Sequence, residues 1–134
     1  MLDNWNEIIV DSGEDILETI DHYITNHGWK NVVVVNAIGS VKDMIFATPI
    51  RNELPLKVGS TPCLGAAEIL SFTGEIMLKE LMDEDLKEVY PKTNSPLFIH
   101  IHASCARAGG QIMGGGLRGG KAFRKLRVFI RPLS

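Results

Sequence analysis

The sequence has 134 residues, of which 45% are hydrophobic and 22% are charged. These values are typical of one globular domain, so we expect a single domain over residues 1–134 and neither a disordered nor a repetitive chain. No stretch approaches about 18 consecutive apolar residues, and the first residues include acids instead of a basic region, which excludes a membrane span and a secretory signal. Two cysteines, Cys63 and Cys105, are too few for a disulfide framework. We therefore expect a cytoplasmic protein without a membrane partner.

Charge is distributed unevenly along the chain. All 16 acidic residues lie at or before Glu88 together with six basic ones, whereas the residues after Glu88 include eight basic residues and none that are acidic. The two parts therefore carry about −10 and +8. Such asymmetry indicates a surface that binds polyanions, but it also arises when acidic and basic elements simply pack side by side in one fold.

The first part of the chain predicts a strand followed by the main helix. Trp5 to Val10 contains a short apolar run that is typical of a strand. Ser12, with Asp15 three residues later, predicts a helix N-cap with capping-box spacing. An apolar stripe then recurs every four residues, at Ile16, Ile20 and Ile24. Gly28 is the expected helix end, because glycine enters the left-handed conformation without cost.

The rest of the chain predicts mainly strands. A turn is expected at Gly39-Ser40, a proline-containing loop over Thr48 to Gly65, and a short acidic helix over Lys79 to Glu88. The expected strands are Asn31 to Ile38, Val41 to Ala47, a pair within Glu68 to Leu78 broken at Gly74, Leu97 to Ala106, and Phe123 to Ile130. One long helix and several strands with short connections predict an α+β domain with a largely antiparallel sheet, one face of which the helix covers.

The strand from Leu97 to Ala106 carries the candidate site. Its alternation places His100 and His102 on one face, where two imidazoles can converge on a cation. Zinc needs at least a third protein ligand, which a neighbouring subunit or a carboxylate such as Glu68 would have to supply. The same pattern is typical of hydrogen-bonded histidines at a sheet surface or a subunit contact.

Two further groups of residues are candidates for binding. Glycines in a strand, here Gly114, Gly115 and Gly116, permit a bulge or a close backbone approach to another chain or a ligand. A set of basic residues near the C-terminus is able to contact phosphates: Arg118, Lys121, Lys125, Arg127 and Arg131. No DNA-reading motif accompanies these cations, so the sequence predicts weak, sequence-independent DNA binding at low salt that disappears near physiological ionic strength.

Five short motifs occur in the order found in one known family. They are Gly13-Glu14-Asp15, Asn36 to Val41, Glu68 to Gly74, His100 to Ser104 and Gly114 to Leu117. On these motifs the chain resembles the plants-and-prokaryotes conserved (PPC) domain family, over residues 13 to about 130.

The resemblance implies an antiparallel α+β domain with one main helix, assembled as a homotrimer. Stand-alone prokaryotic members are commonly regarded as candidate DNA-binding proteins, and the fold is similar to that of acetolactate decarboxylase, a zinc enzyme with three histidine ligands. Many prokaryotic members have His-x-His followed by Gly-Gly-His. Here Gly116 stands at the position of that third histidine, so no cofactor is expected and a zinc ion would lack a ligand.

The function expected from sequence is therefore a DNA-associated regulatory or binding module without evident catalysis, with a weak DNA or protein partner. The alternative is a small-molecule-binding protein, or a metal-dependent enzyme of decarboxylase or lyase type, that uses a cleft around His100 and His102.

Overall fold

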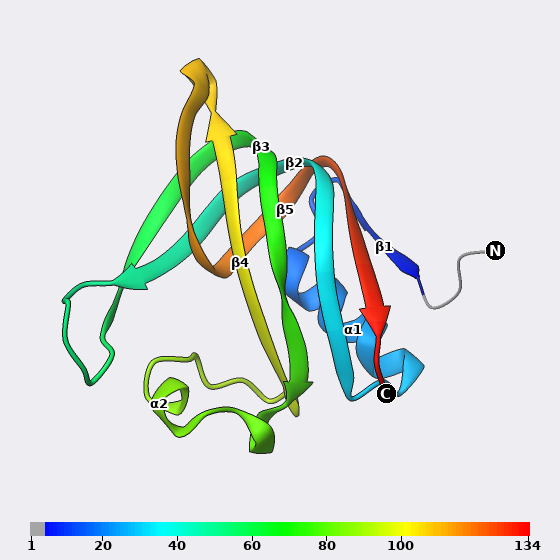
Figure 1. Ribbon diagram of the computed structural model, residues 1–134. Coiled ribbons are helices and arrows are strands. Elements are labelled where there is room, and N and C mark those ends of the chain that lie inside the picture. Colours follow the sequence, from blue (N-terminus) through cyan, green and yellow to red (C-terminus); the bar gives the residue numbers. More distant parts are fainter. Residues whose placement is uncertain (1–4) are drawn as a thin grey trace.

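The computed structural model describes residues 5–134, so the first four residues of the expected 1–134 domain lie outside it. Its strands are β1 (Asn6–Asp11), β2 (Asn31–Pro49), β3 (Val58–Leu78), β4 (Leu97–Arg107) and β5 (Gln111–Pro132). The helices are α1 (Ile16–His27), α2 (Glu84–Lys87) and the single 3₁₀ turns η1 (Lys79–Leu81) and η2 (Ala108–Gly110). Every strand pairing is antiparallel. The expected α+β fold with one main helix is confirmed (Figure 1).

The sheet curls until it closes on itself. Its strand order is β1-β5-β2-β3-β4, and β4 also pairs with the start of β5. Strands β2, β3, β4 and β5 therefore form a ring of pairings, and β1 adds to the outside edge of β5. Closure removes most free strand edges. Edges remain at β1, at the start of β3, and at the first half of β4, residues 97–101, which pairs only with β3.

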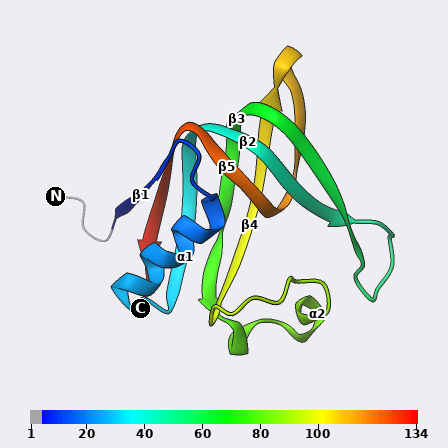
Figure 2. The same ribbon diagram turned by 180° about the vertical axis from the view of Figure 1, so that it is seen from behind.

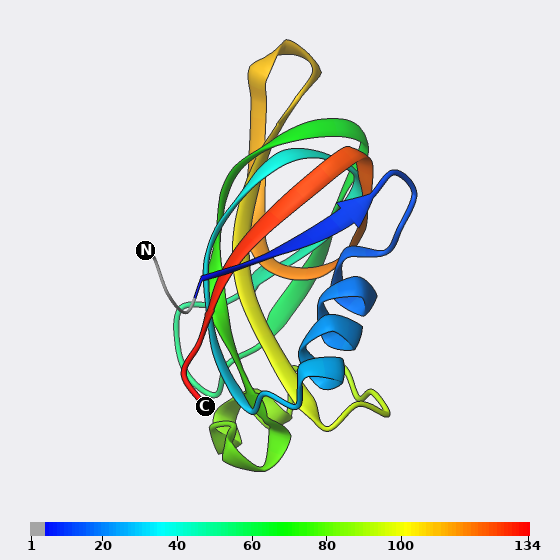
Figure 3. The same ribbon diagram turned by 90° about the vertical axis from the view of Figure 1, so that its right-hand side faces the viewer.

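Helix α1 covers the concave side of the sheet, which faces the viewer in Figure 2 and lies to the right in Figure 3. The predicted stripe Ile16, Ile20 and Ile24 is fully buried against the core. Gly28 ends the helix in the left-handed conformation with φ 68°, as expected. The burial of this stripe fixes the helix on the sheet, because apolar area removed from water is the main source of stability.

The helix begins three residues later than predicted. Asp15, and not Ser12, is the N-cap: its carboxylate accepts a hydrogen bond of 2.9 Å from the Glu18 N–H. The Ser12 hydroxyl instead donates to the Phe123 carbonyl at 2.7 Å. The chain needs residues 12–14 for the turn from β1, in which Gly13 has φ 84°. The N-cap is therefore Asp15, the residue directly before the apolar stripe.

Two predicted breaks are wrong, and the last predicted strand begins too late, because the strands are longer than their sequence patterns suggest. The turn at Gly39-Ser40 is a bend inside β2, where a Cβ on Gly39 would lie 2.1 Å from the Lys125 carbonyl oxygen. Gly74 does not split β3 either; it lets β4 approach, since a Cβ there would lie 2.0 Å from the His100 oxygen. The glycine segment belongs to β5, which extends the predicted Phe123 to Ile130 strand back to Gln111.

The predicted loop over Thr48 to Gly65 shrinks to residues 50–57. Pro62 lies inside β3 and pairs with Ile45 of β2, whereas β4 pairs with β3 only from Ala67 onward. Pro62 is thus on an edge, where its missing N–H costs no hydrogen bond. The predicted helix over Lys79 to Glu88 is reduced to η1 and α2.

Candidate functional site

The two strand histidines lie side by side on the outer face of β4, as the alternation predicts. Ile101 between them is fully buried, and the imidazole rings of His100 and His102 are 5.0 Å apart in an edge-to-face arrangement. His100 also stacks on Phe98 at 5.2 Å between ring centroids. The pair is therefore part of an aromatic cluster on the sheet surface.

The carboxylate next to the pair is Glu75. Its Oε1 lies 3.3 Å from His100 Nδ1, because Glu75 is the residue of β3 that pairs directly with His100. Glu68, the carboxylate suggested by sequence, is opposite Ala106, four positions along β4 from His102. Glu75 could not be selected from sequence, because several acids precede β4 and only the register decides between them.

Arg118 of β5 reaches into the same cluster. Its guanidinium lies 4.1 Å from the centre of the Tyr90 ring, a cation–π contact, and Nη2 donates to the Val89 carbonyl at 3.4 Å. Nη1 is buried and has no hydrogen-bond partner. Tyr90 was missed from sequence, because it lies just beyond the acidic helix predicted over Lys79 to Glu88. An aromatic side chain beside Pro91 was the available signal.

The surroundings shift the pKa values of two of these groups. Burial lowers the pKa of His102, with smaller contributions in the same direction from His100 and Arg118. Burial also raises the pKa of Tyr90, which Arg118 partly opposes. His102 is therefore held neutral beside a permanent cation, while Tyr90 keeps its proton.

Gly116 lies directly opposite His102, on the adjacent β5. A Cβ built on Gly116 would be 4.0 Å from His102 Cδ2 and 4.0 Å from Arg118 Nη1. A third histidine at this position would therefore stand next to the pair, but here the guanidinium is its neighbour. No group of three or more His, Cys, Asp or Glu suited to a metal occurs within residues 5–134. These residues do not fit a zinc site built from one chain.

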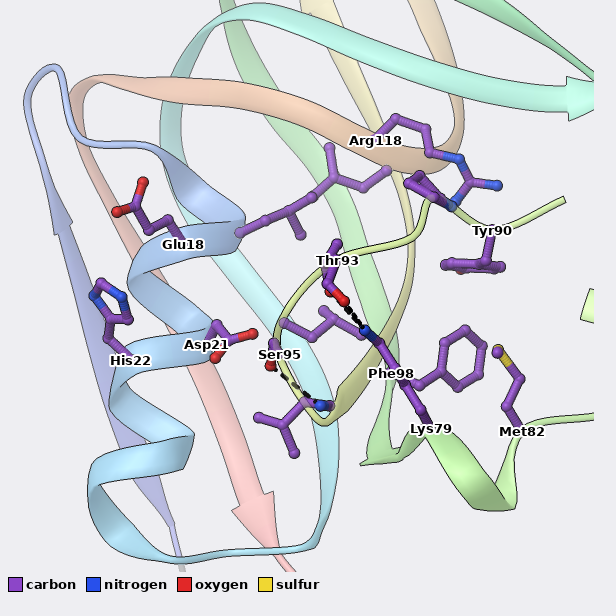
Figure 4. A pocket seen from close by; sticks show the side chains of 15 residues that line it. Glu18, Asp21, His22, Lys79, Met82, Tyr90, Thr93, Ser95, Phe98 and Arg118 are labelled. Carbon is purple, nitrogen blue, oxygen red and sulfur yellow. Dashed lines mark hydrogen bonds between the residues drawn. The ribbon is translucent and has the colours of Figure 1, made fainter. Parts of the chain in front are cut away.

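Beside the cluster, a cavity of about 350 Å³ opens between α1 and the segment that connects β3 to β4 (Figure 4). Tyr90, Phe98 and Arg118 belong to both the cluster and the cavity wall. The remaining wall is largely apolar, and it includes Leu17 from α1, Met82 from the connecting segment, and Leu97 and Ile99 from the free edge of β4.

Polar groups of the cavity are segregated. Glu18 and Asp21 project from α1 on one side, and Arg118 lies on the opposite side (Figure 4). Lys79 is held between them by hydrogen bonds of 2.7 Å to the Thr93 hydroxyl and carbonyl. The lining thus has an acidic end and a cationic end with apolar side chains between.

The other predicted cations form a separate surface. Lys121, Lys125, Arg127 and Arg131 are exposed along β5, with Lys42 of β2 paired opposite Lys121. We call these five residues the β5 basic face. Arg127 forms an ion pair with Glu7, and Asp11 is the backbone partner of Lys125 in the pairing of β1 with β5. Glu7 therefore neutralises one cation of this face, and Asp11 places a second negative charge near it.

The predicted glycines have different roles. Gly114 and Gly115 bring β5 against its own neighbours, because added Cβ atoms would lie 2.6 Å from the Ala103 oxygen and 2.7 Å from the Ala47 oxygen. Their close approach is thus within the chain. Gly116 has more space than either of them.

Comparison with known proteins agrees with this architecture. A model of the Plants and Prokaryotes Conserved (PCC) domain matches residues 7–134. The chain belongs to this family. Its name is also abbreviated PPC, as it is for one of the solved relatives, and the match includes all five strands and α1 except the first residue of β1. A comparison with curated proteins found no match.

Several solved structures share this PPC fold. A PPC protein from Pyrococcus horikoshii is 22% identical, with a TM-score of 0.70, and a metal-containing protein from Archaeoglobus fulgidus is 22% identical, with a TM-score of 0.75. A protein from Bacteroides thetaiotaomicron described as a "putative DNA binding protein" is 14% identical, with a TM-score of 0.76. Each alignment covers 100% of this chain and 82% of the other. At these identities the likeness shows the fold alone.

Within residues 5–134, no helix has the length and apolar character needed to cross a bilayer; the longest, α1, has 12 residues.

Proposed function

We propose that this PPC-domain chain is a non-catalytic, DNA-associated binding module that contacts the phosphate backbone weakly and without sequence selectivity. The observation that supports this is the β5 basic face, which aligns exposed cations along one long strand and its neighbour β2. Cations spaced along a strand meet phosphates without reading base edges. The description of a relative as a candidate DNA-binding protein is consistent with this proposal.

The predicted weakness follows from what surrounds the cations. Glu7 and Asp11 lie close to two of the five, and two exposed acids lie at the start of α1: Glu14 in the turn before the helix and Glu18 in its first turn. An acidic helix is repelled from the major groove, so α1 is not a recognition helix.

Fluorescence anisotropy with a labelled duplex tests the proposal. At about 50 mM salt we expect binding that is lost near 150 mM, with log affinity falling by about 0.9 per phosphate contacted for each unit of log salt. Lys125→Gln with Arg131→Gln should weaken binding at low salt, whereas Arg118→Gln, which removes one charge outside the β5 basic face, should change it less. No binding at 50 mM, or selective binding that resists salt, would contradict the proposal.

A second candidate function is supported by the cavity. A volume of about 350 Å³ lies at the lower end of the range of roughly 300–1,000 Å³ for small-molecule sites, and an apolar lining with a few polar groups is typical of them. The neutral fluorophore N-phenyl-1-naphthylamine should bind with one-to-one stoichiometry. Leu17→Trp, which fills the cavity from α1, should abolish that binding, whereas Leu81→Trp on the exposed η1 turn should not. Equal binding by both variants would place the probe elsewhere.

We propose further that the chain assembles as a homotrimer. The two hairpins that project from the barrel in Figure 1 carry large exposed apolar side chains, among them Leu64 near the start of β3 and Ile112 at the start of β5. Exposed aliphatic side chains on protruding hairpins favour contact with a neighbouring subunit.

A further inference from the structure

The cationic end of the cavity contains the least satisfied polar group of the site. Arg118 Nη1 has no acceptor, and the one hydrogen bond of Nη2, to the Val89 carbonyl, is 3.4 Å long. A buried donor on a charged group is unfavourable unless an acceptor is supplied. The ion pairs found within residues 5–134 involve Glu84, Glu75 and Glu7, and none includes Arg118. The side chain is thus a fixed cation without an anion.

Its contacts orient this cation and leave it able to bind. Tyr90 supports one face of the guanidinium at 4.1 Å, and Gly116 places no side chain next to Nη1, where a Cβ would lie 4.0 Å away. The guanidinium can turn over the ring and keep its cation–π contact, which would bring both Nη1 and Nη2 to one anionic group. Such a two-point contact is the preferred geometry between arginine and carboxylates or phosphates.

The other side chains of the cavity wall indicate the polarity and the charge of the rest of the ligand. Leu17, Met82 and Ile99 present apolar side chains between the two ends of the cavity. Glu18 and Asp21, on the α1 side, would repel a second negative charge there. Lys79 is a second cation in the cavity wall, but its ammonium group already donates two hydrogen bonds to Thr93.

We propose that the cavity binds a small organic anion, with its apolar body against Leu17, Met82 and Ile99 and its single carboxylate, sulfonate or phosphate group on Arg118. This inference rests on the second candidate function, that the cavity binds small molecules, and adds the charge of the ligand and the residue that selects it. His102 is the neutral neighbour in this arrangement. It lies across from Gly116, beside the guanidinium, and contributes no competing positive charge at neutral pH.

Two fluorophores with the same apolar body test the charge selection. 1-Anilinonaphthalene-8-sulfonate carries one sulfonate, whereas N-phenyl-1-naphthylamine has none. In wild-type protein the sulfonate probe should bind about tenfold to a hundredfold more tightly, as expected for charge-assisted hydrogen bonds. Arg118→Met should remove this preference and leave the affinity for the neutral probe within about twofold.

Controls separate the cavity from the surface and from unfolding. Lys125→Gln removes one cation seven positions along β5 and should leave both affinities unchanged. Arg118→Lys, which keeps the charge but not the two-point geometry, should retain part of the preference. Near-UV circular dichroism identifies any variant that has lost its packing. The wild-type ratio of the two affinities tests the proposal even if no Arg118 variant folds.

The outcomes distinguish the two hypotheses. Equal wild-type affinities, or a preference that survives Arg118→Met, would overturn the anion proposal while the cavity remains a small-molecule site. Failure of both probes to bind would overturn the second candidate function as well. A sulfonate preference lost in Lys125→Gln would assign that probe to the β5 basic face and also overturn the proposal.

Discussion

At the scale of single residues, His100 and His102 occupy different electrostatic environments although their rings are only 5.0 Å apart. His100 has the Glu75 carboxylate at 3.3 Å, whereas His102 has the Arg118 guanidinium nearby. The strand register produces this difference, since Glu75 and Gly116 are the direct partners of the two histidines. The pair therefore offers one imidazole in contact with a carboxylate and one whose pKa is lowered by burial and by neighbouring cationic groups.

The titration of His102 is a direct check of this arrangement. NMR of the imidazole protons should give a midpoint for His102 below the ordinary value of about 6.5. Arg118→Gln should raise that midpoint because one of the charges that depress the pKa is removed. Lys125→Gln serves as the matched control and should leave it unchanged. An unshifted His102 in the wild type would mean that the ring is more solvated than the structure shows.

The same shift has a consequence for stability. The folded protein binds the His102 proton less tightly than the unfolded chain does, so this residue stabilises the fold above about pH 6.5. That contribution falls as the pH drops below 6.5 toward the lowered pKa. Urea unfolding should show a smaller loss between pH 7 and pH 5 for His102→Gln than for wild type. An equal loss would assign the acid sensitivity to other groups.

Gly116 permits a test of whether a third histidine at this position would complete a zinc site. Gly116→His combined with Arg118→Ala places an imidazole opposite His102 and removes the competing cation, so we expect stoichiometric zinc after dialysis. The wild-type protein should retain little zinc after the same dialysis. Adding His102→Ala to the double variant should remove the gained zinc. Elemental analysis measures all three, and tightly held zinc in the wild type would show that ligands from another subunit complete the set.

At the scale of elements, the start of α1 depends on one carboxylate. Asp15→Ala should lower the free energy of unfolding by about 1 kcal/mol because the Glu18 N–H loses its acceptor. Asp15→Asn should cost only a few tenths of that, since asparagine is an equally good N-cap. Urea titration followed by far-UV circular dichroism gives both values. A larger loss for Ser12→Ala than for Asp15→Ala would return the cap to Ser12.

The elements that sequence predicts well are those with a local cause. The stripe Ile16, Ile20 and Ile24 has helical spacing, and Gly28 ends the helix through its own backbone preference. The long strands were divided at Gly39 and Gly74 because glycine is locally a breaker. In the fold both glycines make room for a neighbouring strand, which depends on residues some 26 to 87 positions away. Local pattern carries no information on that approach.

The residues of the candidate site also separate into those with a local sequence cause and those that depend on strand pairing or on a loop. Period-two alternation places His100 and His102 together because that property belongs to one strand. Glu75 and Arg118 join them through pairings of β4 with β3 and β5, and Tyr90 arrives from a segment with little regular structure. These three could not be chosen from sequence, since each depends on register or on a loop path. Resemblance to the family identified Gly116 at the position of the third histidine, but it did not indicate that the Arg118 guanidinium lies next to this position.

At the scale of the whole molecule, folding reduces the charge asymmetry of the chain. The acidic first part and the basic last part come together where β1 lies along β5, with Glu7 on Arg127 and Asp11 opposite Lys125. Arg118 escapes this neutralisation because β1 pairs only with residues 125–130 of β5. The molecule therefore has a partly neutralised outer face and, in the cavity, an Arg118 guanidinium without an ion pair, which are suited to the proposed weak and selective anion binding respectively.

The projecting hairpins give the last prediction, which concerns assembly. Leu64 is 65% exposed on the outer side of β3, and burying such a side chain against another subunit yields roughly 1.5–3 kcal/mol per copy. Light scattering on a size-exclusion peak should give three times the chain mass at micromolar concentration. Leu64→Asp should shift the protein toward monomer because three copies of the charge would be buried. Leu81→Asp, at a site 66% exposed on η1, should remain trimeric. A wild-type monomer would contradict the trimer, whereas a trimer unaffected by Leu64→Asp would move its interface away from the β2–β3 hairpin.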